Sequence, residues 1–418
     1  MDARTPGSAQ TPRLHYAWVI VATGTLCIVA CLGFGRFTLG MLLPSMARSL
    51  GLSYSRLGYI GTGNFVGYLA AVLVCGPIAA RIGPRLLIFL ALLLVGGSMF
   101  LVSRSSSFPT LLVLYTLTGV GSGATNVPVM GLIARWFRSS LRGRAAGIAS
   151  AGSGLAIVAS GRFVPFVNEV RGPEGWRTSW LVLAVAVTII AVVSLVLFRN
   201  DPAEKHTTPL GSDPPRAPAH PAAARRDPRF HRSAAVYLLG VIYAIFGYTY
   251  AIYVTFIVTF LVRERGFSEG TAGAFWSVVG FLSLFSGPAF GSLSDRLGRR
   301  AGLMAAFSTF SLAYVLAGAG LPQVALYASV ACFGITAWAV PSIMVAAVSD
   351  QVGAPHALAA FGFVTFFFGL GQIAGPAVAG NLAERTASFS SSFLMAGAFA
   401  AIAIAVSAIF LKPTPAAR

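Results

Sequence analysis

Charged side chains are scarce in this sequence, and acidic ones are the scarcest. Only 10% of the 418 residues are charged, and 12 acidic residues stand against 30 basic ones. Ordinary soluble domains carry charge on about a quarter of their residues. The low charge content therefore argues against an ordinary soluble protein.

Cysteine is also scarce, and its placement excludes two classes of site. The chain has four cysteines, all in apolar stretches: Cys27, Cys31, Cys75 and Cys332. They form no CxxC pair and no Cys/His ligand set, so neither a metal site nor a disulfide framework is predicted. We expect small apolar packing residues here, and no metal or cofactor.

Apolar runs, in contrast, are long and frequent. Hydrophobic residues make up 56% of the chain, with long apolar runs such as 86–102, 180–198 and 392–411. Runs of this length cross a bilayer as helices, which satisfy their own backbone hydrogen bonds. We expect an all-α polytopic membrane protein with twelve spans: 16–46, 57–79, 85–103, 109–135, 144–167, 178–198, 234–261, 271–293, 300–319, 322–349, 357–382 and 388–411.

The basic residues are unevenly shared between the two sides of these spans. Most of the 30 Lys and Arg residues lie in the amino tail, the even-numbered connections and the carboxyl tail. The positive-inside rule then places both termini in the cytoplasm. We expect the protein in the cell membrane. The first run is too long for a signal peptide, so none is expected. No stretch provides a soluble basic domain, so we expect no nucleic-acid partner.

The middle of the chain differs from everything around it. Residues 199–232 are rich in proline and charge and lack apolar periodicity, as in a flexible cytoplasmic linker. The expected organisation is an amino tail (1–15), a six-helix bundle (16–198), this linker, a second six-helix bundle (233–411) and a carboxyl tail (412–418). We expect the protein to be a monomer in the lipid bilayer.

The two halves share landmarks at a nearly constant offset. GPIAARIGPR (76–85) matches GSLSDRLGRR (291–300), NVP (126–128) matches AVP (339–341), and GSG (152–154) matches GLG (369–371). Internal repeats of this kind are typical of transporters whose halves move about a site at the midplane.

GSLSDRLGRR resembles the signature loop of the major facilitator superfamily, and the six-plus-six layout agrees with that family over the whole chain. The resemblance implies alternating access, with glycines at close helix approaches and an acid and arginines as an interdomain latch. It identifies as gating residues Gly76, Arg81, Gly83, Arg85, Gly291, Asp295, Arg296, Gly298, Arg299 and Arg300. The first copy departs from the pattern, with Ala80 for the acid and Pro84 for a basic residue, which implies a one-sided latch.

Finer resemblances point to the substrate class. GRFTLGMLLPSMARSLGLS with GTGNFVGYLAA resembles the YbfB/YjiJ branch, and RGRAAGIASAGSGLA with GWR resembles the branch of monocarboxylate and oxalate/formate transporters. Both imply a small organic, often anionic, substrate. Proton-coupled drug exporters usually carry an arginine four residues before the first glycine of a GxG in the fourth span. Here Tyr115 holds that position, which argues against drug/proton antiport.

The charges embedded in the spans are positive. No acidic residue lies in the middle of a span, whereas Arg36 lies in the first and Arg162 in the fifth. An intramembrane arginine needs water, carbonyl groups or an anion, and a guanidinium can bind a carboxylate through two hydrogen bonds. We take Arg36 as a substrate contact, with snorkelling or a backbone bond as the alternative. For Arg162 the structural interpretation is preferred.

Neutral polar and aromatic residues complete the candidate substrate site. Asn64, Asn126 and Gln372 each need a hydrogen-bond partner inside a span, and bonding between helices is the alternative to substrate binding. Tyr243 and Tyr250 lie on one face of the seventh span, where a belt or packing role competes with a cavity wall. Trp338 precedes Pro341 and could close the opposite wall, although packing is the preferred interpretation.

These features predict a secondary transporter for a small organic anion such as a monocarboxylate. Two alternatives remain open: an efflux pump for amphipathic organic compounds, and, from another class, a non-transporting membrane receptor or scaffold. An enzyme is not expected, because no span holds paired carboxylates, a metal-ligand set or a nucleophile with an evident base.

Overall fold

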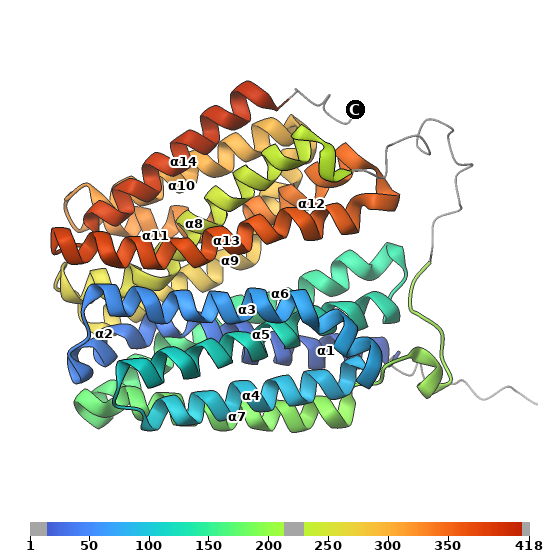
Figure 1. The fold of residues 1–418 in the computed structure, drawn as a ribbon, viewed down its shortest axis with the longest axis horizontal. Coiled ribbons are helices and arrows are strands. Elements are labelled where there is room, and N and C mark those ends of the chain that lie inside the picture. The colour runs from blue at the N-terminus through green and yellow to red at the C-terminus, as the bar shows by residue number, and fades with distance from the viewer. Residues whose placement is uncertain (1–14, 213–229, 412–418) are drawn as a thin grey trace, which may run out of the picture.

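The computed structural model describes residues 15–212 and 230–411, and its regular structure is helical (Figure 1). The first span is a composite of α1 (Ala17–Ile28), the π-helix η1 (Val29–Phe37) and α2 (Leu39–Leu50). The tenth is divided into α11 (Val324–Thr336) and α12 (Ala339–Val352). The remaining long helices are α3 (Tyr54–Ile82), α4 (Pro84–Arg104), α5 (Phe108–Trp136), α6 (Ser139–Arg171), α7 (Gly175–Leu197), α8 (Ala234–Arg263), α9 (Glu269–Leu297), α10 (Arg299–Gly318), α13 (Ala354–Thr386) and α14 (Ser390–Phe410).

All twelve predicted spans coincide with membrane-length helical segments. Ten stretches of the described chain are long and apolar enough to cross a bilayer, and the longest, Ser139–Leu197, contains both α6 and α7. α5 is not among the ten, because glycine, serine and threonine dilute its apolar residues. Serine caps begin several helices: Ser53 and Ser268, for example, accept hydrogen bonds from the backbone N–H groups of Arg56 and Thr271.

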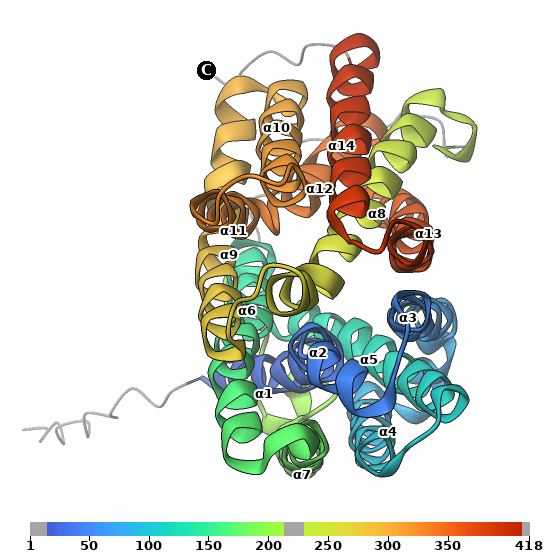
Figure 2. The ribbon, with the colours of Figure 1, turned by 90° about the vertical axis from the view of Figure 1, so that its left-hand side faces the viewer.

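The helices form two groups, α1–α7 (the first half) and α8–α14 (the second half), which lie one above the other in Figures 1 and 2. Within the halves, α3 packs on α5 and α8 on α13; between them, α3 packs on α13 and α6 on α9. Small residues permit these approaches. A Cβ added at Gly67 would lie 2.1 Å from the Thr116 carbonyl oxygen, and one at Gly371 would lie 2.1 Å from that of Ala244.

Part of the predicted linker is ordered against the first half. The backbone N–H of Leu210 donates to the Trp136 carbonyl at 2.9 Å, and that of Arg138 donates to the Leu210 carbonyl at 2.9 Å. The indole N–H of Trp136 donates to the Arg199 carbonyl at 3.0 Å. Backbone pairing at the end of α5 thus holds residues 199–212 in this structure, whereas the flexibility expected for residues 199–232 as a linker stays a prediction. Residues 1–14, 213–229 and 412–418 lie outside the described part of the chain.

The contact between α3 and α5 gives a test of helix packing. A Cβ at Gly119 would lie 2.0 Å from the Asn64 carbonyl oxygen, whereas one at Gly131, on the same helix, meets no atom within 4 Å. We expect Gly119→Ala to force the helices apart and to lower the free energy of unfolding by about 1–3 kcal/mol. Thermal unfolding in detergent measures this. Equal stability of Gly119→Ala and the control Gly131→Ala would contradict the packing.

Candidate functional site

The first span changes its helical form around Arg36. Residues Val29–Phe37 form a π-helix, which was not predicted from the sequence. Gly33 explains the location, since a Cβ there would lie 2.0 Å from the Cβ of Ala156 on α6. Short π-helical segments occur often at functional sites. The close approach of α6 thus coincides with a π-helical segment that contains the arginine.

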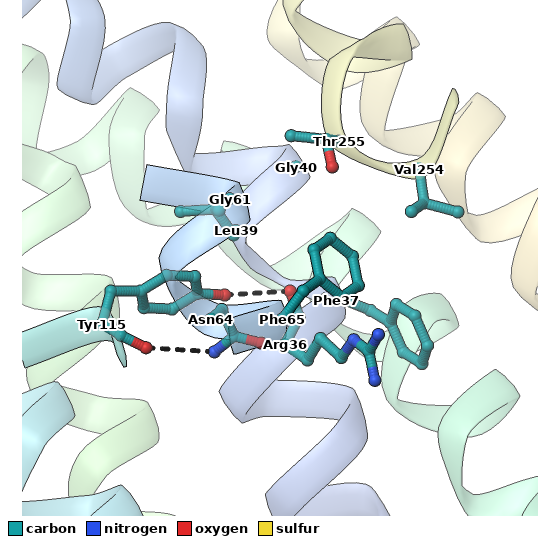
Figure 3. A pocket seen from close by; sticks show the side chains of 10 residues that line it. All are labelled: Arg36, Phe37, Leu39, Gly40, Gly61, Asn64, Phe65, Tyr115, Val254 and Thr255. Atoms are coloured by element: carbon teal, nitrogen blue, oxygen red, sulfur yellow. Dashed lines mark hydrogen bonds between the residues drawn. The ribbon is translucent and has the colours of Figure 1, made fainter. Parts of the chain in front are cut away.

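The carbonyl groups of the π-helix are satisfied by side chains of α3 and α5. Ser122 Oγ donates to the Cys31 carbonyl at 2.7 Å, and Tyr115 Oη donates to the Arg36 carbonyl at 3.0 Å. Asn64 Nδ2 donates to the Tyr115 carbonyl at 3.2 Å (Figure 3) and also lies 3.5 Å from the Gly35 carbonyl, to which it donates. Irregular backbone survives in a membrane protein only with such partners. Asn64 therefore has a structural role in this conformation.

The Arg36 guanidinium reaches from the first half to the second. Its Nη2 donates to Gln372 Oε1 on α13 at 2.8 Å. Its Cζ lies 4.2 Å from the ring centroid of Phe65 and 4.7 Å from that of Tyr68, distances at which aromatic faces attract a cation. Its Nε is buried and has no acceptor among the described residues. Asn126 supports this arrangement, because its Nδ2 donates to Tyr68 Oη at 2.8 Å.

Aromatic residues of the second half form the opposite wall. Trp338 lies at the break between α11 and α12, where its backbone N–H donates to Ser286 Oγ at 2.9 Å. Its ring centroid lies 6.1 Å from that of Phe37 and 6.0 Å from that of Tyr250. Broken helices often form substrate sites in transporters. Here the irregular parts of the first and tenth spans meet beside Arg36.

Little space remains beside the arginine. A pocket between α2, α3, α5 and α8 is lined by Arg36, Asn64 and Tyr115 of the first half and by Val254 and Thr255 of the second (Figure 3). It offers about 10 Å³ to the centres of water molecules, enough for about one. This pocket is therefore too small for an organic substrate in this conformation.

Two of the candidate site residues lie farther from Arg36. Tyr243 is buried in the second half, with its ring stacked on Phe368 at 4.6 Å between centroids. Arg162 is exposed on α6, on the same face as Leu155 and Phe166, and does not line the pocket. Phe65, Tyr68 and Tyr115 were not predicted from the sequence as site residues. The four-residue spacing from Asn64 to Tyr68, one helical turn, was the available signal for Tyr68.

The signature motif forms its ion pairs within the second half. Arg299 pairs with Asp295, and its Nε donates to Asp350 Oδ2 on α12 at 2.9 Å. The expected interdomain latch is not formed in this conformation, because Asp295 and its arginine partner belong to the same half. Arg296 is exposed, and Arg300 lines a hollow with Arg299 and Asp350.

The first copy of the motif uses different partners. Arg85 Nε donates to the Leu195 carbonyl at 2.6 Å, and its backbone N–H donates to Asn200 Oδ1 at 3.0 Å. Arg81 is exposed. The two copies nevertheless keep the same turn, since Gly83 and Gly298 have φ values of 85° and 88°, a region that strains other residues.

The halves are joined at the end of the molecule opposite the motif, the end that faces the viewer in Figure 2. There Glu269 of α9 pairs with Arg48 and accepts a hydrogen bond from Asn168 Nδ2 at 2.6 Å. The rings of Tyr54 and Phe389 lie 4.9 Å apart between centroids. At the motif end, by contrast, Cβ atoms added at Gly76 and Gly291 would meet no atom within 4 Å.

Sequence comparison identifies the family. The family described as "Uncharacterised MFS-type transporter YbfB" matches residues 28–408. The chain belongs to this branch of the major facilitator superfamily. It is 24% identical to the hexuronate transporter of Bacillus subtilis, with 90% of this chain and 91% of the relative covered. It is 23% identical to human monocarboxylate transporter 2, covering 94% and 86%, and 23% identical to the probable sulfoacetate transporter SauU of Cupriavidus necator, covering 93% of each.

Solved structures confirm the superfamily fold. A crystal structure of the nucleoside transporter NupG superposes with a TM-score of 0.73 at 14% identity, covering 96% of this chain and all of that one. A bacterial homologue of the human lysosomal transporter Spinster, in an inward-facing and unoccupied conformation, gives 0.69 at 16% identity, covering 95% and 97%. The twelve-helix fold predicted for this family member is thus confirmed.

Tyr115 allows the support of the π-helix to be tested. Tyr115→Phe removes the hydroxyl that satisfies the Arg36 carbonyl, and we expect a loss of about 1 kcal/mol in the free energy of unfolding. Tyr243→Phe is the matched control, because the Tyr243 hydroxyl has no hydrogen-bond partner among the described residues. Thermal unfolding of both variants measures the difference. Equal stabilities would contradict the role assigned to Tyr115.

Glu264, at the end of α8, gives a test based on pH. Its Oε2 accepts from Ser388 Oγ at 2.5 Å and its Oε1 from the Phe389 N–H at 3.0 Å. Burial raises the pKa of the Glu264 carboxyl above its usual value of 4.5, although these hydrogen bonds oppose the shift. The folded protein therefore holds this proton more strongly than the unfolded chain, which stabilises the fold below pH 4.5. That contribution is lost as the pH rises through the raised pKa.

We expect Glu264→Gln to remove this part of the pH dependence. Measured by thermal unfolding from pH 4.5 upward, the stability of the variant relative to wild type should increase as the pH rises. A stability difference that stays constant with pH would show that the carboxyl of Glu264 titrates alike in the folded and unfolded states.

Proposed function

We propose that this chain is an alternating-access transporter of small organic anions, and that Arg36 binds the carboxylate of the substrate. The observation that carries the proposal is the position of the Arg36 guanidinium. It lies between the halves, hydrogen-bonded to Gln372 and flanked by the rings of Phe65 and Tyr68. A guanidinium in such surroundings attracts a carboxylate strongly, because little water screens its charge.

The surroundings of Arg36 favour a monoanion with an apolar body. Asn64 and Tyr115 already donate to carbonyl groups of the π-helix or of α5, and Asn126 donates to Tyr68. Phe37, Tyr250 and Trp338 offer mainly ring surface. One cation among aromatic faces suits one carboxylate on an apolar body, such as a monocarboxylate. The printed names of the relatives, which include hexuronate, sulfoacetate and monocarboxylate transporters, agree with an anionic substrate.

The contacts between halves support alternating access. They include Arg48 with Glu269 and Tyr54 with Phe389 at one end, whereas glycines at the motif end face open space. The distribution of basic residues favours a cytoplasmic position for the motif end and for both termini. We therefore interpret this conformation as inward-facing, with each half moving as one body and residues 199–232 joining them. In the opposite conformation, Asp295 would become available to the first half as a latch.

Reconstituted transport tests the proposal. Purified protein in liposomes is supplied with labelled lactate, benzoate, glucuronate, succinate and a cationic dye, with and without a pH gradient. We expect saturable uptake of monocarboxylates. Dye transport without any anion transport would instead support an efflux pump and overturn the proposal.

Arg36 and Arg162 provide a matched pair of variants. Arg36→Gln removes the charge that binds the carboxylate, and we expect anion uptake to fall at least tenfold while the protein remains folded. Arg162→Gln removes an exposed charge away from the pocket, and we expect uptake near the wild-type level. Unchanged uptake by Arg36→Gln would assign that arginine a structural role.

A further inference from the structure

Gln372 is the polar partner of the Arg36 guanidinium across the two halves. It projects from α13, is 3% exposed, and accepts from Arg36 Nη2 at 2.8 Å. The sequence showed that no carboxylate within the spans could neutralise Arg36, so closure of the empty protein would leave an uncompensated charge. The amide oxygen of Gln372 removes that difficulty, because hydrogen bonds to a charged group are roughly twice as strong as neutral ones.

The hydrogen bond to Gln372 uses only part of the guanidinium. Nε and Nη2 lie on one edge of the guanidinium plane, where a carboxylate can accept from both with its two oxygens. In the structure one amide oxygen accepts from Nη2, and the buried Nε has no acceptor among the described residues. Gln372 therefore already binds one of the two nitrogens that such a carboxylate would use.

A carboxylate cannot bind this edge in addition to Gln372. Arg36 Nη2 already donates to the Gln372 amide oxygen at 2.8 Å, and the guanidinium carbon lies 4.2 Å and 4.7 Å from the ring centroids of Phe65 and Tyr68. A carboxylate that accepts from both Nε and Nη2 must therefore displace the amide oxygen from Nη2. Gln372 and the substrate compete for the same donor.

We propose that Gln372 replaces the substrate carboxylate at Arg36 when the transporter is empty, and so permits the empty transporter to change conformation. The inference rests on the proposed function, in which Arg36 binds the anion. When substrate is bound, its carboxylate compensates the buried charge. When substrate is absent, Gln372 does so, and the halves can close without it. Gln372 thus acts as a positioning residue that permits net transport in addition to exchange.

Two variants of Gln372 separate this role from simple packing. Gln372→Leu keeps the size but removes the acceptor, so Arg36 has no polar partner in the empty protein. Gln372→Glu supplies a permanent carboxylate that competes with the substrate. The matched control is Thr62→Val, which removes a hydrogen bond across the same α3–α13 interface, from Thr62 Oγ1 to the Ile373 carbonyl at 2.9 Å, without touching Arg36.

The first measurement needs no substrate. The native cysteines are first replaced by alanine, and cysteines are introduced at Ile82 and Leu297, the exposed last residues of α3 and α9. Spin labels attached there report the distance between the halves at the motif end. We expect the empty wild type, Gln372→Glu and Thr62→Val to populate both short and long distances. In Gln372→Leu the short-distance population should fall about tenfold or more, because closure buries an unpartnered charge.

The second measurement uses benzoate, whose flat ring suits the aromatic walls. We expect Gln372→Leu to bind benzoate about tenfold more tightly, to retain benzoate exchange and to lose net benzoate efflux. Gln372→Glu should bind benzoate at least tenfold more weakly. Thr62→Val should behave as wild type in every assay.

The outcomes distinguish the two proposals. Weaker benzoate binding by Gln372→Leu would overturn the proposal, because removing a group that competes with benzoate cannot weaken benzoate binding. An unchanged distance distribution in that variant would overturn it as well. If wild type moves none of the anions tested while Gln372→Leu still loses the short-distance state, the proposed substrate class fails and Gln372 remains the partner of Arg36. Equal losses of exchange and net efflux would assign Gln372 to packing.

Discussion

The need to compensate the partly buried guanidinium of Arg36 connects the irregular features of this transporter. Arg36 lies near the end of a π-helical segment, and Ser122, Asn64 and Tyr115 donate hydrogen bonds to three of its carbonyl groups. The rings of Phe65 and Tyr68 lie beside the Arg36 guanidinium, and the amide oxygen of Gln372, in the other half, accepts a hydrogen bond from it. A charge at this depth is costly unless it is paired or hydrated. The local backbone, the interface between halves and the substrate site therefore depend on one another.

The two halves meet through small residues and polar contacts that differ along the interface. Gly58 and Gly380 allow α3 and α13 to approach closely, since a Cβ at Gly58 would lie 2.4 Å from the Pro376 carbonyl oxygen. Toward the end opposite the motif, Glu269 joins Arg48 and Asn168 across the halves. Glycines tolerate sliding between helices, whereas ion pairs exist in one arrangement or another. The interface thus combines a close-packed middle with polar contacts that can break at one end.

The repeated motif has diverged in chemistry while keeping its backbone. Gly83 and Gly298 adopt the same unusual conformation, but Arg299 binds two carboxylates whereas Arg85 binds a carbonyl and, through its N–H, an amide. Ala80 and Pro84 in the first copy account for this difference, because they remove an acid and a base. In the present conformation both copies hold helices within their own half together. A latch between the halves that uses the acid of only one copy therefore stays a prediction from the sequence.

The sequence alone determined the spans, the repeat, the family and the presence of an uncompensated arginine, because apolar length and charge are local properties of the chain. It also named Gln372, Asn64 and Trp338, since polar or bulky groups stand out in apolar helices. It could not predict that Gln372 meets Arg36 from 336 residues away, that Asn64 supports the π-helix, or that Arg162 faces outward. Those facts depend on helix rotation and on which half faces which. Only the packing of the whole molecule fixes them.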